Sequence, residues 1–120
     1  MANTALLIEW GMPRQGRETK ALEVFFNSIR FWETLRGAGR IESYQTFGSL
    51  DGNQEQRSGF LVIQGSADQI DALVRAEDYR QVLVQVVSIA TNVCVTSAET
   101  NEAMGTRMTR YADGLAKLGI

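Results

Sequence analysis

Residues 57–69 read Arg-Ser-Gly-Phe-Leu-Val-Ile-Gln-Gly-Ser-Ala-Asp-Gln, and the rest of the fold can be worked out from them. The part ending at Gly65 is short and apolar, which is typical of a strand with at least one buried face. Ser66 follows, with Gln69 three residues later. At that spacing a hydroxyl and an amide satisfy each other's free backbone donors at a helix start. The stretch therefore predicts a strand that leads directly into a helix.

The segments before this stretch predict a strand, a helix and a second strand. Thr4–Trp10 is a short apolar run followed by glycine and the only proline of the chain. Apolar residues recur every three or four positions across 16–37, as in an amphipathic helix. Ile41–Leu50 is a further strand candidate. A polar stretch beginning with a turn-forming Asp-Gly pair separates it from Arg57–Gly65, so the two should pair as a hairpin.

The segments after this stretch predict one or two helices, a fourth strand and a terminal helix. The helical region has two amphipathic parts on either side of Ala76, and the sequence leaves open whether they form one helix. Thr91–Ser97 is the fourth strand. From Thr100 onward an apolar stripe recurs at spacings of four, three, four and three. It could cover its own subunit or pack on a partner. Its members are Met104, Met108, Tyr111, Leu115 and Leu118.

The element order is that of an α+β, ferredoxin-like βαββαβ fold with an added C-terminal helix. A length of 120 residues fits one domain over 1–120. The order and length resemble the dimeric α+β barrel superfamily, in which the sheets of two such subunits close face to face. The resemblance implies a homodimer but identifies no subfamily.

Composition excludes several classes of site. The chain has 12 Lys plus Arg, 14 Asp plus Glu, no histidine and one cysteine, with a formal net charge of −2. Without imidazole it cannot build Ser-His-Asp or Cys-His catalysis, or a histidine-ligated metal or haem site. We therefore expect no metal and no cofactor. The slightly acidic net charge and the lack of a basic run argue against nucleic acid as a partner. No stretch is apolar and long enough to span a membrane. The expected compartment is therefore the cytoplasm.

Side-chain alternation sorts the strands into two faces. One face is uniformly aliphatic, and we expect it to pack against Phe25, Phe26, Ile29 and Leu83 of the helices. The other mixes apolar and polar groups, which fits a cavity that holds water or an organic ligand. For the second strand, either Tyr44 and Thr46 or Ser43, Gln45 and Phe47 could face this cavity. The aliphatic face carries Leu6, Ile8, Leu61, Ile63, Val93 and Val95; the mixed face carries Leu7, Glu9, Phe60, Val62, Gln64, Asn92, Cys94 and Thr96.

Five residues are the candidate ligand-binding set: Glu9, Tyr44, Gln64, Asn92 and Thr96. A carboxylate such as Glu9 in a half-apolar cavity could transfer a proton. The simpler interpretations are an ion pair with an arginine such as Arg14 or Arg17, or a position in water at the rim of a dimer. The amides could orient a carbonyl or stabilise an oxyanion, or they could satisfy each other. The sequence assigns no catalytic residue.

Two functions remain compatible with the sequence. The first is a dimeric module that binds a small organic ligand in a cavity on the sheet face and has no chemistry of its own. The second is a cofactor-independent monooxygenase acting on aromatic or quinol-type substrates, a branch of the resembling superfamily that uses asparagine, tryptophan and tyrosine groups. Asn92, Trp10, Trp32 and Tyr44 are compatible with that branch. The histidine-dependent branches of the superfamily are excluded.

Overall fold

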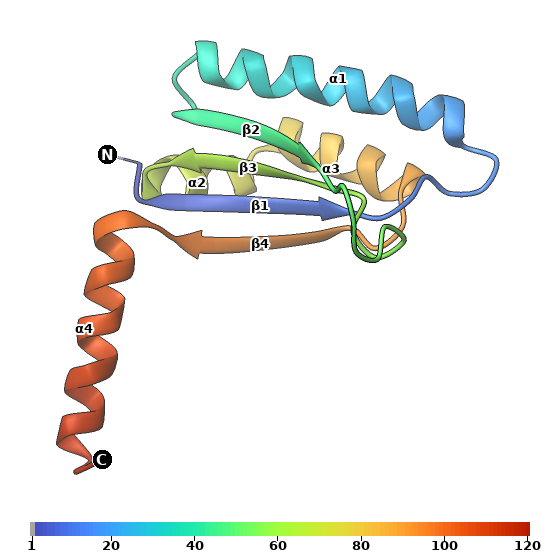
Figure 1. Ribbon diagram of the computed structural model, residues 1–120. Helices are drawn as coiled ribbons and strands as arrows, with labels where there is room; N and C mark the ends of the chain where they lie inside the picture. The colour runs from blue at the N-terminus through green and yellow to red at the C-terminus, as the bar shows by residue number, and fades with distance from the viewer. Residues whose placement is uncertain (1) are drawn as a thin grey trace.

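The computed structural model describes residues 2–120 and contains one four-stranded sheet with four helices (Figure 1). The sheet has the order β2-β3-β1-β4, and every neighbouring pair of strands is antiparallel. The predicted hairpin is confirmed, because β2 pairs with β3. The elements are β1 Thr4–Trp10, α1 Glu18–Gly37, β2 Ser43–Gly48, β3 Gly59–Gly65, α2 Ala67–Arg75, α3 Glu77–Ile89, β4 Cys94–Glu99 and α4 Asn101–Lys117.

The helical region after β3 is two helices, α2 and α3. The capping box is present: the Ser66 hydroxyl accepts from the backbone N–H of Gln69, and the Gln69 side chain accepts from the backbone N–H of Ser66. Ala76 has extended backbone angles (φ −74°, ψ 136°), so the α-helical hydrogen-bond ladder stops there and restarts. Two acidic residues, Glu77 and Asp78, occupy the first turn of α3, where the helix dipole favours negative charge.

The core lies between one face of the sheet and helices α1, α2 and α3. Leu6, Ile8, Leu61 and Ile63 are buried, as the aliphatic alternation predicts. The register explains this, because Leu6 lies opposite Ile63 and Ile8 opposite Leu61.

Three residues expected in the core are exposed. Phe25 and Phe26 are 38% and 57% exposed, because α1 turns a different stripe toward the sheet, one with Ala21, Val24 and Ser28 in its first half. Val95 is 38% exposed, because β4 is an edge strand that the helices cover poorly.

The helix α4 is separate from this core. It leaves the end of β4 and points away from the sheet on the side opposite α1 and α3 (Figure 1). None of its residues is buried. No helix within residues 2–120 is long and apolar enough to cross a membrane.

Candidate functional site

The uncovered face of the sheet, which we call the open face, carries three of the five predicted site residues. Glu9 lies opposite Phe60 and Cys94, Thr96 lies opposite Leu7, and Gln64 lies opposite Ala5 and Ser43. Glu9 is paired: its carboxylate accepts from the Arg57 guanidinium at 2.8 Å. The expected partners Arg14 and Arg17 instead donate to the carbonyls of Val87 and Ser88 at the end of α3.

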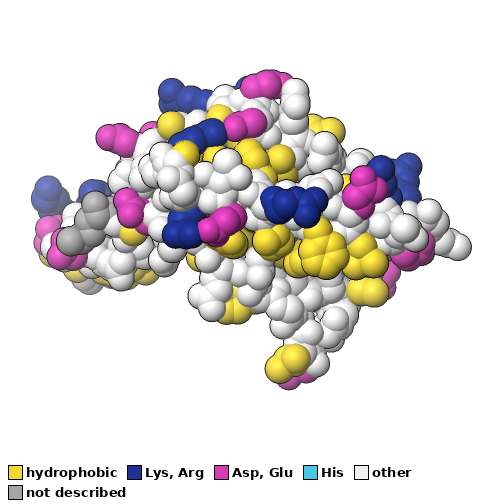
Figure 2. Space-filling view, turned by 90° about the horizontal axis from the view of Figure 1, so that it is seen from above, with side chains coloured by type: hydrophobic (Ala, Val, Ile, Leu, Met, Phe, Trp, Pro, Cys, Tyr) yellow, Lys and Arg dark blue, Asp and Glu magenta, His cyan; other side chains and the backbone are white. Residues whose placement is uncertain are grey.

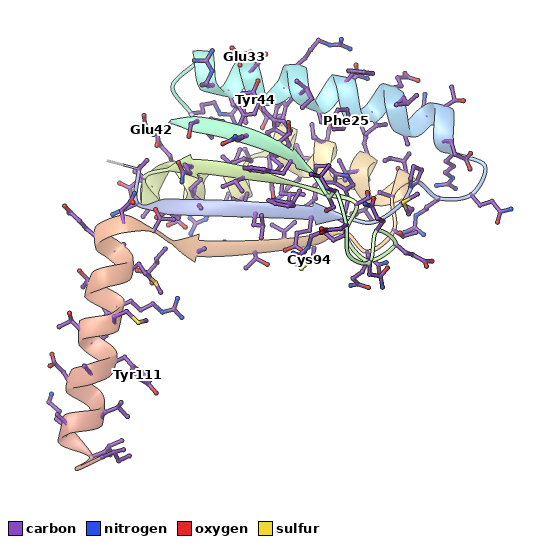
Figure 3. The ribbon with its side chains drawn as sticks, in the orientation of Figure 1. Phe25, Glu33, Glu42, Tyr44, Cys94 and Tyr111 are labelled. Atoms are coloured by element: carbon purple, nitrogen blue, oxygen red, sulfur yellow. The ribbon has the colours of Figure 1, made fainter. Side chains whose placement is uncertain are left out.

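Tyr44 lies on the other side of the sheet. Its register partner is the buried Ile63, and its hydroxyl donates to the Glu33 carboxylate of α1 at 2.8 Å (Figure 3). This hydrogen bond raises the pKa of Tyr44 above its ordinary value. Ser43, Gln45 and Phe47 are the residues of β2 that face the open side. The sequence leaves both alternatives for β2 open, because neither side of this strand is cleanly aliphatic, and the structure places the candidate Tyr44 apart from Glu9 and Gln64.

Asn92 lies before β4, not in it. The strand begins at Cys94, three residues later than expected, and Asn92 has a left-handed backbone (φ 53°) in the loop after α3. Its side-chain amide donates to the Glu55 carbonyl at 3.0 Å and so connects this loop to the β2–β3 loop. Asparagine tolerates that conformation better than most residues, which gives Asn92 a structural role at this position.

A cavity of about 350 Å³ lies on the helix-covered side, between the sheet and helices α1 and α3. Pockets for small organic ligands have volumes of roughly 300–1,000 Å³, so this one is within the usual range. A smaller hollow of about 210 Å³ adjoins it and shares Trp10, Phe25, Thr46 and Ser58 with it. The site suggested by the chain's own shape is therefore on the opposite side of the sheet from the predicted one.

Aromatic rings form two walls of this cavity. Trp10 of β1 and Phe25 of α1 meet edge to face, with ring centroids 6.4 Å apart. Trp32 of α1 and Tyr79 of α3 form a tilted pair at the same centroid distance. All four residues line the cavity. Rigid aromatic faces of this kind suit a flat apolar ligand, because they supply large contact areas with little entropy to lose.

Trp10 has the room it needs because of a glycine. Gly59 lies directly opposite Trp10 in the register, and a Cβ built at Gly59 would come within 2.7 Å of the Trp10 ring and 2.9 Å of the Phe47 carbonyl. No real side chain tolerates contacts that short. The absence of a side chain at Gly59 therefore lets the indole lie over β3 and form part of the cavity lining.

Two buried donors are free to serve a ligand. Tyr79 and Trp32 are 3% and 4% exposed. No hydrogen bond within residues 2–120 involves the Tyr79 hydroxyl or the Trp32 indole N–H, yet neither atom is sealed from solvent without a partner. Both residues line the cavity. Burial raises the pKa of the Tyr79 hydroxyl, which keeps it protonated and able to donate at neutral pH.

Two serine hydroxyls of the lining are occupied. Ser28 donates to the Phe25 carbonyl at 2.7 Å, and Ser58 donates to the Gly11 carbonyl. Within residues 2–120, Tyr79 and Trp32 are the buried lining residues whose side-chain donors have no protein partner, and the exposed Thr46 adds a further hydroxyl to the lining.

The cavity is open on the helix-covered side. Leu22 and Phe25 line it and are 62% and 38% exposed, so an apolar entrance lies beside α1. Figure 2, which looks onto this side, shows hydrophobic side chains gathered near its middle, with charged groups around them. A ligand would reach the aromatic walls through this entrance.

The sequence contained part of the signal for this site. The aromatic residues of α1 are evident in the sequence, but their periodicity predicts a place in the core, and nothing in the sequence distinguishes Tyr79 from the other apolar residues of its helix. The two free donors could not be found, because their lack of partners depends on how α1, α3 and β1 pack together. Within residues 2–120 no cluster of three or more acidic or cysteine side chains could hold a metal ion.

Comparisons with known proteins show similarity at the level of structure. No protein-family model matches the chain, and no curated protein matches it in sequence. A dimeric ferredoxin-like protein of unknown function from Jannaschia sp. CCS1 superposes with a TM-score of 0.66 at 12% identity, covering 81% of this chain and 98% of its own.

Two similar structures carry enzymatic names. A candidate antibiotic biosynthesis monooxygenase from Deinococcus radiodurans gives a TM-score of 0.60 at 12% identity, covering 84% of this chain and 93% of its own. SnoaB, a cofactor-independent oxygenase from Streptomyces nogalater, gives 0.53 at 8% identity, with 83% and 95% covered. At these identities the similarity concerns the fold. This chain has a ferredoxin-like fold followed by an additional C-terminal helix, and several proteins of similar structure are described as dimeric.

Proposed function

We propose that this protein is a homodimer that binds a flat, largely apolar organic molecule in the cavity between the sheet and helices α1 and α3. The observation that carries the proposal is the pair of free, buried donors, Tyr79 Oη and Trp32 Nε1, in an otherwise apolar aromatic cavity. A ligand carbonyl or phenol oxygen would replace water at these donors and form hydrogen bonds in an otherwise apolar cavity.

The dimer is the second part of the proposal. Similar structures are described as dimeric. The open face is the surface that a second copy would cover, because it carries Leu7, Phe60 and Val62 with no element of its own chain above them. Face-to-face packing of two such sheets, about 10 Å apart, would bury these side chains.

Fluorescence titration tests the ligand site. Trp10 and Trp32 line the cavity, so anthraquinone or 1-anilinonaphthalene-8-sulfonate should quench their emission saturably, with one molecule bound per chain. Ser28→Phe should abolish this binding by filling the cavity. Asn27→Phe places the same ring on the exposed side of α1 and should leave binding intact. Equal binding by both variants would contradict the proposed site.

A further variant separates this cavity from the open face. Gln64→Leu alters a predicted site residue on the open face, away from the cavity lining. Binding that is lost in Gln64→Leu and kept in Ser28→Phe would place the ligand between the two sheets of a dimer, as the sequence analysis expected.

Cofactor-independent oxygenation is the second candidate function, favoured by the two free donors and by the similarity to SnoaB. In such a reaction an acidic ring carbon loses two hydrogens, one atom of O₂ becomes its carbonyl oxygen, and the other atom leaves as water. Tyr79 stays protonated at neutral pH, so it would stabilise a substrate oxyanion by donation, and the substrate would have to supply the acidity itself.

Oxygen uptake with anthrone and a quinol distinguishes the two functions. A catalyst should consume one O₂ per anthrone converted to anthraquinone, and Tyr79→Phe should slow it by about tenfold or more. Uptake no faster than in buffer, together with saturable quenching, would assign the protein to ligand binding alone.

A further inference from the structure

The terminal helix α4 carries an apolar stripe that nothing in its own chain covers. Met108 is 47% exposed and Tyr111 is 65% exposed. Residues three and four apart share one side of a helix, so Met104, Met108, Tyr111, Leu115 and Leu118 form one continuous surface. We call this surface the α4 stripe. A solvated helix would not be expected to align its apolar residues in this way.

The direction of α4 is fixed by its first residues. The backbone N–H of Thr100 donates to the Asn3 carbonyl at 2.9 Å, and the Asn101 side chain donates to the Ala2 carbonyl at 3.1 Å. Asn101 has a left-handed backbone (φ 55°), which turns the chain sharply out of β4. These bonds tie the base of α4 to the start of the central strand β1.

The α4 stripe and the open face border the same space. In Figure 3, Cys94 lies on the open side of the sheet, and Tyr111 points from α4 toward the region beneath that face. By helical spacing Met108 and Met104 lie on the same side as Tyr111. The chain therefore presents two half-apolar surfaces at an angle to each other, both facing a volume that its own residues do not fill.

We infer that a second copy of this chain occupies that volume, and that α4 is an arm whose stripe packs on the flank of the second copy. With a twofold axis the contact would be mutual, because each α4 would pack on the other subunit. The similar structures support this partner, because dimeric ones match about four fifths of this chain and more than nine tenths of themselves. Residues 101–120 are one sixth of the chain, close in size to the unmatched part.

An arm would enlarge the interface beyond the sheet contact alone. Strands of six or seven residues at ~3.4 Å each, four of them ~4.8 Å apart, make a face of roughly 400 Å². A standard dimer buries about 800 Å² on each partner. The 17 residues of α4 extend ~26 Å, and one side of such a helix adds roughly 250 Å². Two sheets packed face to face lie ~10 Å apart, and α4 is longer than that distance. The helix would therefore extend beyond the sheet of the second copy and lie along its side.

Sedimentation equilibrium on the full chain tests the arm. Met108→Asp and Tyr111→Asp place a charge on the α4 stripe and should each weaken the dimer by about tenfold or more. Thr109→Asp adds the same charge on the opposite side of α4 and should leave the dissociation constant within about twofold. All three residues are exposed in the single chain, so the variants keep the fold of the body.

Hydrogen exchange on the full chain supplies a second readout. Amides of α4 should be protected in the wild-type dimer, because an isolated helix of this length is marginal in water, and they should lose protection in Met108→Asp. A monomeric wild-type protein at micromolar concentration would overturn the inference. So would stripe variants that dimerise as tightly as Thr109→Asp, or α4 amides that stay equally protected in Met108→Asp.

Discussion

The Tyr79 hydroxyl is a single group whose role can be separated from the packing of its ring. It has no hydrogen-bond partner within residues 2–120, so Tyr79→Phe should change the free energy of unfolding by less than ~0.5 kcal/mol. Tyr79→Ala removes a buried ring and should cost roughly 3 kcal/mol or more. In fluorescence titrations Tyr79→Phe should weaken binding of a carbonyl-bearing ligand by up to ~10-fold. Unchanged affinity would remove Tyr79 from ligand recognition.

Tyr79 should also make stability depend on alkaline pH. Burial raises its pKa above the ordinary value of 10.0, so the folded chain keeps a proton that the unfolded chain loses. This contribution to stability is complete below about pH 10 and disappears as the pH rises through the raised value. Urea unfolding from about pH 8 to about pH 11 should show a smaller loss of stability for Tyr79→Phe than for the wild type. Tyr44, whose pKa is also raised, is present in both proteins and cancels in the comparison.

Gly59 offers a third test at a single position. Gly59→Ala should destabilise the protein by roughly 1–3 kcal/mol and shift the emission of Trp10, because the new methyl group would collide with the indole. Gly48 lies opposite Gly59 in β2, and a Cβ there meets nothing within 4 Å. Gly48→Ala is therefore the matched control. Equal destabilisation of the two variants would show that strand backbone effects dominate over the contact with Trp10.

The capping box at the start of α2 stabilises this helix through hydrogen bonds between residues close in sequence. Ser66→Ala removes the side-chain acceptor of the Gln69 N–H and should cost about 1 kcal/mol. Thermal or urea unfolding measures this loss. Ser88→Ala, which removes a hydroxyl near the end of α3, should cost less, since that hydroxyl donates only to a carbonyl within its own helix.

The elements themselves were largely predictable from sequence, and their orientations were less so. Thr4–Trp10 matches β1 at both ends, and the capping box placed the start of α2. Periodicity failed where apolar residues are too frequent to mark one side: in α1, Phe25 and Phe26 are more exposed than Val24. In β2 alternation could not distinguish Tyr44 from Phe47, since both sides carry one aromatic residue. Only pairing with β3 decides between them.

The whole molecule should depend on the open face for its dimer. Val62 lies near the middle of that face, between Leu7 and Gln45. Val62→Lys should yield a folded monomer in sedimentation experiments, because a charge in the sheet interface would be buried without a partner. Val84→Lys makes the same change on the exposed surface of α3 and should remain dimeric. A dimeric Val62→Lys protein would place the interface elsewhere.

The candidate site forms only when the helices pack on the sheet, so only part of it could be predicted from the sequence. Alternation correctly placed Glu9, Gln64 and Thr96 on the open face, and a cavity was expected there because its groups are mixed. The cavity of a single chain lies behind the uniformly aliphatic face, where α1 and α3 do not fill all the space above β1. Incomplete filling of this kind depends on the distances between helices and sheet, which a linear pattern does not contain.

The strand order has a consequence for how the chain comes to be folded. β1 is made first, yet its pairing partners are β3, beginning at Gly59, and β4, beginning at Cys94. The hairpin of β2 and β3 needs only residues that are close in sequence, so it can form early. The central strand β1 can pair only after β3 has been made, nearly fifty residues later. During synthesis the apolar run Leu6–Ile8 would therefore stay unpaired longest, and a holding chaperone would find its best target in this run.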